Sequence, residues 1–570
     1  MAEASPCDRV LVIGWDGANF DLVRKWAAEG KLPAAARLLA EGSAGHLEST
    51  IPPISAPAWS SLATGLNPGR HGIYYFREHV PGSYELRLVK GADRHGKPLW
   101  RMLNEQGKQA GVVNLVMTWP PEPLDGFMIS GMDAPGEHSD FTYPPELADE
   151  LRRAVGEYLI ELPLEEEARN FRYDALWAKI EQEMEARIAA VRYLLRAKAW
   201  DVFVVNFRAT DSVQHHFWKF MDAAHPQYDA TPAARWGDAI ERVYRRLDGF
   251  LGDLLAELDE STLVILMSDH GFGPVGDTAL YLNKWLAQEG FLKLKAQDGR
   301  AAGGSLLAGL RGKLWQGAWV RLRQITPQAV KDLAERLWPR FYQRIRYPAA
   351  HFFIDWAESR AYGDEYQESI WINLVGREPQ GIVQPGAEYE ALRDEIIARL
   401  GALRHPHTGE PIIEAAYRRE EVYHGSEVGR APDIVVIPGQ EPYVRVRPSH
   451  SVADPAPVRT LTPEELRADY LPSGVHRRTG MFLALGPGIR QGHQLPTRHI
   501  CDVTPTVLAA LGCRVPAGLD GRVIEEMFTT PPDVRYFDDV ELPPRAEQAM
   551  DYSEEEAKLV SEKLKGLGYI

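Results

Sequence analysis

Six short, continuously apolar runs constrain the fold of this 570-residue chain more than any other feature. Each run is followed at once by polar or glycine-bearing turn residues. Continuous rather than alternating hydrophobicity is typical of strands that are buried on both faces of a sheet. The six runs are residues 10–13, 111–116, 127–130, 202–207, 263–267 and 481–485.

Helix-like stretches lie between these runs, notably at 22–41, 173–198 and 236–258. The alternation of buried strands with helices predicts an α/β fold, in which a mainly parallel sheet is flanked by helices on both faces.

The region 271–430 has a different character. It contains a glycine-rich patch at 299–304, basic and tryptophan-bearing helical sequence at 306–346, and extended sequence at 362–383. Apolar positions at helical spacing indicate packed helices. We interpret 271–430 as an inserted cap domain that selects the substrate. The catalytic core would then comprise 1–270 and 431–535, resuming at the segment PDIVVIPG, and 536–570 would form a solvated helical tail.

Charge and composition exclude several functional classes. The formal net charge is -16, which disfavours nonspecific binding to nucleic acid or to anionic lipid. No segment approaches the ~18 uninterrupted apolar residues of a membrane span, and the N-terminus lacks the pattern of a signal peptide. The three cysteines, Cys7, Cys501 and Cys513, show no metal-binding spacing, and structural disulfides are not expected. We therefore expect a cytoplasmic protein.

Polar residues that could do chemistry follow the first apolar run. Asp16, in IGWDGA, stands where a parallel sheet presents its carboxyl edge to ligands, although an Asp after a strand often only caps a turn. Ser55 precedes Ala56-Pro57 and a short helical run, which predicts an N-cap. A hydroxyl there also experiences the positive end of the helix, and a nearby dication would make it a nucleophile.

Further candidates follow later strands. Asp211 and His215 are four residues apart, so on a helix both side chains point the same way and can share a metal ion. Asp269 and His270 end another apolar run and are followed by glycines, which leave room for a substrate. His476 precedes the last apolar run. These carboxylates and imidazoles suit two zinc-like ions.

This ordered series resembles the alkaline phosphatase superfamily, most closely its type I phosphodiesterase and nucleotide pyrophosphatase branch. The resemblance extends from Val10 to about Phe528 and includes the segments TGLNPGRHGI, DVTPTVLAALG and LDGRV. It implies a hydrolase that cleaves a phosphodiester, pyrophosphate or phosphomonoester through a phosphoseryl intermediate on Ser55, with a small-molecule phosphate ester as substrate.

The resemblance also implies how the ligands divide between two divalent metal ions, zinc or alternatively manganese or iron. One ion would be held by Asp211, His215 and His476, and the other by Asp16, Asp269, His270 and the Ser55 oxygen.

The chain departs from the branch at two positions. Ser55 stands where the branch usually has threonine, and Phe76 where it has an asparagine that binds a phosphoryl oxygen. The second change leaves an oxyanion contact to be supplied by another group. Candidates that lie near the matched motifs are Arg77, Asn114, Arg208 and Arg478.

Other functions remain alternatives at this stage. A phosphotransferase or mutase of the same superfamily would pass the phosphoryl group from Ser55 to an alcohol. A sulfatase is disfavoured because Trp59 stands where the sulfatase signature has arginine. A noncatalytic binding protein is disfavoured because the nucleophile and the ligand set are intact. The sequence leaves the oligomeric state open.

Overall fold

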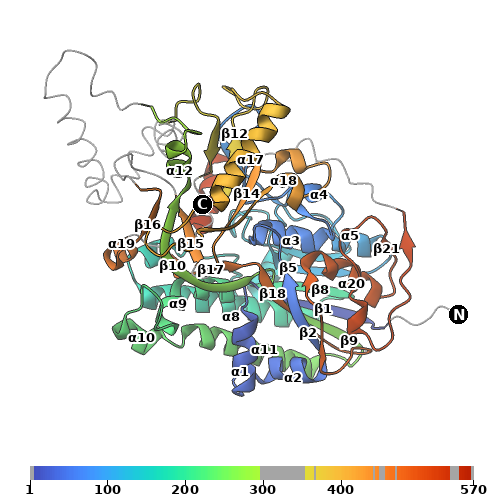
Figure 1. The fold of residues 1–570 in the computed structure, drawn as a ribbon. Coiled ribbons are helices and arrows are strands. Elements are labelled where there is room, and N and C mark those ends of the chain that lie inside the picture. Colours follow the sequence, from blue (N-terminus) through green and yellow to red (C-terminus); the bar gives the residue numbers. More distant parts are fainter. Residues whose placement is uncertain are drawn as a thin grey trace, which may run out of the picture.

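All six apolar runs form strands of one ten-stranded sheet, which confirms the expected α/β fold (Figure 1). The computed structural model describes residues 6–295, 354–364, 367–440, 443–447, 456–468, 472–538 and 551–566. The strand order is β19-β2-β18-β9-β1-β8-β5-β6-β7, with β20 beside β2. The strands are β1 (Arg9–Trp15), β2 (Ser43–Glu48), β5 (Ala110–Leu115), β6 (Gly126–Ser130), β7 (Thr142–Tyr143), β8 (Val202–Phe207), β9 (Thr262–Met267), β18 (Thr479–Leu485), β19 (His493–Gln494) and β20 (Arg498–His499).

The middle of the sheet is parallel. Strands β9, β1, β8, β5 and β6 are consecutive parallel neighbours, whereas β18 runs antiparallel between β9 and β2. Gly14 of β1 lies opposite Asn206 of β8 and Met267 of β9. Because these three strands end in register, the residues that follow them meet at one edge of the sheet.

The helices follow the sequence pattern with one interruption. The stretch 22–41 forms two helices, α1 (Phe20–Ala28) and α2 (Pro33–Glu41), rather than one. Gly30, with φ +73°, breaks the run, and Pro33 begins α2, where its missing N–H costs nothing. The other two expected stretches form α8 (Tyr173–Ala197) and α11 (Ala239–Glu257).

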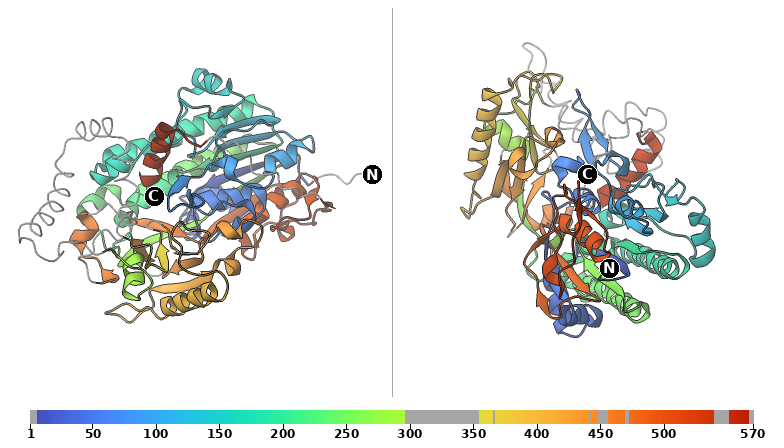
Figure 2. Two further views of the ribbon diagram at one scale, coloured as in Figure 1. Left: turned by 90° about the horizontal axis from the view of Figure 1, so that it is seen from above. Right: turned by 90° about the vertical axis from the view of Figure 1, so that its right-hand side faces the viewer.

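Helices cover both faces of the sheet (Figures 1 and 2). Helices α8 and α11 lie side by side, joined by ion pairs such as Arg192–Asp253 at 2.7 Å. Helices α3 (Ser55–Thr64), α5 (Leu99–Asn104) and α20 (Val503–Ala510) pack together as a second group. The apolar faces of both groups and the strands share one core, so the sheet edge is held on a rigid support.

A smaller antiparallel sheet has its own hydrophobic core. It contains β11 (Ala361–Gly363), β12 (Ser369–Ile372), β14 (Ile434–Pro438) and β13 (Ile413–Arg418), and it packs with α12 (Leu282–Gln288) and α17 (Ala387–Gly401). Strands β11 and β12 fall within the stretch predicted to be extended.

The segment PDIVVIPG was expected to return to the main core, and that expectation is wrong. It forms β14 of the smaller sheet, and the chain re-enters the ten-stranded sheet only at β18. A buried apolar run signals a strand but not which sheet it joins. The division into a core, a cap at 271–430 and a tail stays a prediction, and the helical stretch predicted at 306–346 and the glycine-rich patch at 299–304 lie outside the described residues.

One long strand leads from the ten-stranded sheet toward the smaller sheet and is the centre of a third sheet, of four strands. Strand β10 (Gly271–Tyr281) pairs with β17 (Gly474–Arg477) near its start and with β15 (Tyr443–Arg447) and β16 (Val458–Thr460) further along. It leaves the main core directly after the Asp269-His270 pair. The smaller sheet is therefore positioned relative to this edge of the core by a continuous strand.

The C-terminal helix, α21 (Glu554–Gly566), is present as predicted but is not fully solvated. Val560 and Leu564 are buried in the main core, and the Lys563 ammonium donates a hydrogen bond to the Ala134 carbonyl at 2.9 Å. No helix in the described part of the chain has both the length and the hydropathy of a membrane-spanning segment. The three cysteine thiols are buried and free.

Candidate metal centre and active site

Three neighbouring strands deliver most of the candidate ligands to one sheet edge. Asp16 follows β1, and Asp269 and His270 follow β9. Asp211 and His215 lie on α9 (Ala209–Met221), which begins directly after β8. The expected convergence of these side chains at the carboxyl edge is what the structure displays, and all five are buried.

Ser55 enters this edge from α3. It is the first residue of the helix, and Ile54 occupies the N-cap position in which Ser55 was expected. The Ser55 hydroxyl oxygen lies 3.4 Å from Asp16 Oδ1 and 3.4 Å from His270 Nε2. As the first helical residue, Ser55 places its oxygen at the positive end of the α3 dipole, where a negative charge is stabilised.

The C-terminal end of α3 is fixed by contacts between segments that are distant in the sequence. The helix ends at Gly65 with φ +69°, and the Gly65 carbonyl accepts hydrogen bonds from the backbone N–H groups of Asp520 and Gly521 at 2.9 and 3.1 Å. The Asp520 carboxylate accepts from the Asn67 backbone N–H at 2.7 Å and pairs with Arg70 at 3.2 Å. The TGLNPGRHGI and LDGRV segments thus form one joint that anchors the helix carrying Ser55.

The remaining histidine arrives on β17. His476 Nε2 lies 3.1 Å from Asp211 Oδ1 and 3.1 Å from His215 Nε2. His215 Nε2 is in turn 3.4 Å from the same Asp211 oxygen. Three ligand atoms therefore meet at a single point. Two come from one helix and the third comes from a strand about 260 positions later in the sequence.

All three histidines are oriented by backbone carbonyls. The Nδ1–H groups of His215, His270 and His476 donate to the carbonyls of Gly474, Gly271 and Pro53 at 3.0, 3.0 and 2.9 Å. Because a carbonyl can only accept, the proton lies on Nδ1, and Nε2 presents a lone pair to the site. This tautomer leaves Nε2 able to bind a metal ion.

Burial keeps the imidazoles of His270 and His476 neutral. It lowers the pKa of His476 to about 3 and also lowers the pKa of His270. Burial disfavours the Asp211 carboxylate, but its interactions with His215 and with the Arg208 guanidinium outweigh this effect and lower the Asp211 pKa. Burial and the charge of Asp16 raise the pKa of Asp269 well above its usual range, a shift that a bound cation would reverse.

The ligand atoms form two groups that could each hold a metal ion. The first is Asp211, His215 and His476, the same three residues expected to share one ion. The second is Asp16, Asp211 and His270. Asp211 thus belongs to both groups. Asp269, expected in the second set, directs its Oδ2 atom to within 3.5 Å of His270 Nε2.

Asp269 supplies an independent sign that the pocket suits a cation. Its Oδ1 atom accepts a hydrogen bond from the Gly17 backbone N–H at 3.1 Å. Its Oδ2 atom is buried and has no hydrogen-bond partner among the described residues. An orphaned carboxylate oxygen beside imidazole lone pairs costs free energy unless a cation is present, so the donor set fits a metal ion.

Gly17 makes this close assembly possible. Its φ of +62° is strained for any residue with a side chain. A Cβ atom there would lie 3.0 Å from the His270 Cε1 atom and 3.4 Å from Asp211 Oδ1. The glycine that follows Asp16 therefore brings the two candidate groups close together.

The sequence resemblance is supported by a family model. The model for type I phosphodiesterases and nucleotide pyrophosphatases matches residues 10–460. This chain belongs to that family. It is therefore a hydrolase acting on phosphoric ester or anhydride bonds, as the sequence predicted.

The solved structures that are similar to this chain have low sequence identity to it. Human ectonucleotide pyrophosphatase/phosphodiesterase 5 has 13% identity and a TM-score of 0.48, covering 92% of this chain and 100% of its own. Inactive murine ectonucleotide pyrophosphatase/phosphodiesterase 5 in complex with AMP has 13% identity and a TM-score of 0.46, and the match covers 89% of this chain and 95% of the murine chain. Among curated proteins, no sequence matches this chain.

Several supporting residues of this phosphodiesterase-family site escaped the sequence analysis. The Asp16 Oδ2 atom accepts hydrogen bonds from the Asn206 amide at 2.7 Å and the Trp59 indole at 3.2 Å. The Thr210 hydroxyl donates to the Asp16 carbonyl at 2.6 Å. These residues show no motif of their own, although Asn206 is a polar residue inside an apolar run, and that signal could have identified it.

The four candidate oxyanion contacts occupy different environments. Arg77 is half-buried in the hairpin of β3 (Arg77–His79) and β4 (Leu86–Leu88). Asn114 is buried at the end of β5 with φ +57° and donates to the Asn206 carbonyl at 3.3 Å. Arg478 pairs with Glu48 and is half-exposed. Arg208 is fully buried among carboxylates.

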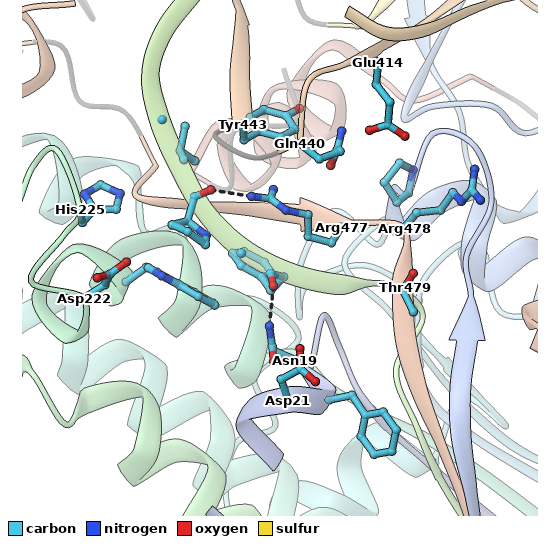
Figure 3. Close-up of a pocket in the computed structure, with 18 of the residues that line it drawn as sticks. Asn19, Asp21, Asp222, His225, Glu414, Gln440, Tyr443, Arg477, Arg478 and Thr479 are labelled. Carbon is cyan, nitrogen blue, oxygen red and sulfur yellow. Dashed lines mark hydrogen bonds between the residues drawn. The ribbon is translucent and has the colours of Figure 1, made fainter. Parts of the chain in front are cut away.

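Figure 3 shows a cavity of about 790 Å³ whose lining includes Phe272 and Pro53, which contact the first metal-ligand group, but none of the proposed metal ligands. The cavity lies between strands β10 and β17 on one side and Glu414 of β13 and Tyr443 of β15 on the other. Phe272 forms part of its wall and contacts His215 and His476, with ring centroids 4.8 and 5.4 Å away. Figure 3 shows Arg477 in this wall, bonded to the Pro274 carbonyl at 2.6 Å.

Proposed function

We propose that this protein hydrolyses a small-molecule phosphodiester, pyrophosphate or phosphomonoester through a phosphoseryl intermediate on Ser55, using two divalent metal ions. The observation that supports this most directly is the arrangement around the Ser55 oxygen. Three histidine Nε2 atoms and the Oδ1 atoms of Asp16 and Asp211 converge within a buried site beside that oxygen. Such a set of nitrogen and oxygen donors suits zinc, or alternatively manganese or iron.

We infer that Asp211, His215 and His476 hold one ion. Asp16, His270 and Asp269 hold the other, together with the Ser55 oxygen, and Asp211 lies within reach of both. When bound, paired ions of this kind stabilise the attacking and leaving oxygens of an in-line displacement.

Residues of the chain itself carry the remaining parts of the reaction. The Ser55 oxygen forms a bond to phosphorus as the bond from phosphorus to the leaving oxygen breaks. The positive end of α3 favours the ionised serine over the neutral one. Water then cleaves the bond between phosphorus and Ser55, which releases phosphate or a phosphomonoester and restores the hydroxyl.

The cavity beside Phe272 is where we place the group attached to the reacting phosphoryl group. Its volume of about 790 Å³ is within the range of small-molecule sites. Glu414, Tyr443 and Gln440 border it from the 271–430 region and the segment just after it, which supports the proposal that the inserted region selects the substrate. A cytoplasmic location stays a prediction.

Hydrolysis assays on metal-reconstituted protein test the proposal. The substrates are bis-p-nitrophenyl phosphate, p-nitrophenyl phosphate and p-nitrophenyl sulfate, and the variants are Ser55→Ala and Ser60→Ala. Ser60 is a fully buried serine of the same helix, so Ser60→Ala controls for the loss of a buried hydroxyl.

We expect wild type and Ser60→Ala to cleave a phosphate ester, Ser55→Ala to be inactive, and acid-quenched wild type to carry phosphate on the Ser55 peptide. If Ser55→Ala retains wild-type turnover, Ser55 is not the nucleophile. Transfer of the phosphoryl group to an added alcohol in preference to water would instead indicate a phosphotransferase.

A further inference from the structure

Arg208 lies behind the metal ligands rather than in front of them. It occupies the N-cap position of α9, three residues before Asp211. Its side chain has 0% exposure, as do those of Asp16 and Asp211. Its nitrogen atoms lie against the Oδ2 atoms of Asp16 and Asp211, whereas the Ser55 hydroxyl lies beside Asp16 Oδ1, so its sequence-based assignment as an oxyanion contact needs a different explanation.

The Arg208 guanidinium faces three carboxylates. Its Nη2 atom donates to Asp211 Oδ2 at 2.8 Å, and its Nη1 atom lies 3.7 Å from Asp16 Oδ2. Its Nε atom lies 3.1 Å from Glu161 Oε2. Arginine suits this position because its planar fork can address several carboxylates at once, which a lysine ammonium cannot do with the same geometry.

The oxygens of both aspartates are divided in the same way. The Oδ2 atoms of Asp16 and Asp211 face Arg208, and the Asp16 atom also receives the Asn206 and Trp59 donors. The Oδ1 atoms face the opposite direction, toward the histidine nitrogens and, in the case of Asp16, toward the Ser55 hydroxyl. Each carboxylate therefore has one oxygen engaged from behind and one presented to the centre.

We propose that Arg208 is a positioning residue of the metal centre, which fixes the carboxylates of Asp16 and Asp211 from behind so that one oxygen of each faces the metal ions. This inference rests on the proposed function. Partners of this kind orient metal ligands, and their loss typically weakens metal binding about 10- to 100-fold.

Glu161 allows the geometric role of Arg208 to be separated from its charge. Removing Arg208 alone would leave Glu161 as an uncompensated buried anion and would also change the field at the metal ions. Burial raises the pKa of Glu161 to about 7, so above that pH the Arg208–Glu161 pair is neutral as a unit. At such a pH the double substitution Arg208→Met with Glu161→Gln deletes the anchor without changing the net charge. Arg208→Lys keeps the positive charge in place and loses only the planar fork of the guanidinium.

The experiment measures Zn²⁺ affinity by competition with a chelating dye, and the visible absorption of the Co²⁺-loaded protein, for wild type and these variants. Arg393→Met is the matched control. Arg393 is also an arginine with a buried side chain, 3% exposed, that pairs with Glu390 and Glu420, but it lies on α17 away from the metal centre. Circular dichroism and thermal melting of each variant verify folding.

We expect the double variant and Arg208→Lys to bind Zn²⁺ about 10- to 100-fold more weakly than wild type, with altered Co²⁺ absorption, and Arg393→Met to bind as wild type does. Where activity is measurable, kcat falls and KM changes little. Wild-type metal affinity and Co²⁺ absorption in a folded double variant would overturn the inference, as would wild-type values in Arg208→Lys if the double variant does not fold. A rise confined to KM would restore the substrate-contact role. Failure of wild type to bind any metal would instead refute the proposed function.

Discussion

Substituting Gly17 by alanine should impair the active site by moving His270, and the structure gives the size of the effect. The substitution has two separable costs. Gly17 has φ +62°, and an alanine in this left-handed region costs about 1–2 kcal/mol. The added Cβ would also lie 3.0 Å from His270 Cε1 and 3.0 Å from Phe272 Cδ2, closer than ordinary van der Waals contact.

The second cost bears on function. Relieving a contact of 3.0 Å requires His270 to shift by a few tenths of an ångström. A misplacement of about 1 Å can lower a rate about 100-fold, so a shift of roughly half that size should lower kcat/KM roughly tenfold. Zn²⁺ affinity should fall in parallel, because His270 is a proposed ligand.

Gly30→Ala is the matched control. Gly30 has φ +73°, and an added Cβ there meets nothing within 4 Å, so this variant has the backbone strain without the crowding. We expect both variants to lose about 1–2 kcal/mol of unfolding free energy in denaturant titrations, and only Gly17→Ala to lose activity toward a p-nitrophenyl phosphate ester. Equal kcat/KM and Zn²⁺ affinity in the two folded variants would refute the argument from crowding.

Three further predictions concern metal, support and pH. Dialysis against a chelator should abolish hydrolysis, and activity should return as the second equivalent of Zn²⁺ is added; return with a single equivalent would contradict a two-ion site. Trp59→Phe, which removes the indole donor to Asp16, should lower kcat several-fold, whereas Trp200→Phe, which loses an indole bond to a backbone carbonyl, should not. Burial lowers the pKa of His71 to about 3, so between pH 3 and 6.5 the unfolded state binds more protons than the folded state. The free energy of unfolding therefore falls as the pH falls from 6.5 toward 3. In His71→Gln the change of unfolding free energy with pH, measured by denaturant titration, should be smaller by the equivalent of about one proton.

Much of the fold was predictable because the parallel strands are buried on both faces. Continuous apolar runs identify such strands, and short segments after them place polar residues at one edge. The convergence of Asp16, Asp211 and Asp269 follows from this rule alone. The helix pair at 22–41 was predicted as one unit because its apolar spacing continues across Gly30.

Other features depend on contacts between residues far apart in the sequence, which no local sequence pattern predicts. The apolar run that forms β14 was assigned to the main core, since a run of this kind has the same appearance in either sheet. Arg208 and Glu161 are charged residues with no sequence motif, and their burial follows from three segments that meet in the folded chain. Ser55 was expected to cap α3 rather than to begin it, a difference of one residue that local composition does not resolve.

The route by which His476 reaches the centre has a consequence for the order of assembly. Asp211 and His215 are on one helix, but His476 follows Asp211 by 265 positions. At ribosomal rates of about 5–20 residues per second, a nascent chain holds the first two ligands for roughly 13–53 s before the third is made. During that interval the group is a two-residue chelate of low affinity. Loading of the first ion is therefore a late event, and a product truncated before β17 carries the nucleophile without a complete first site.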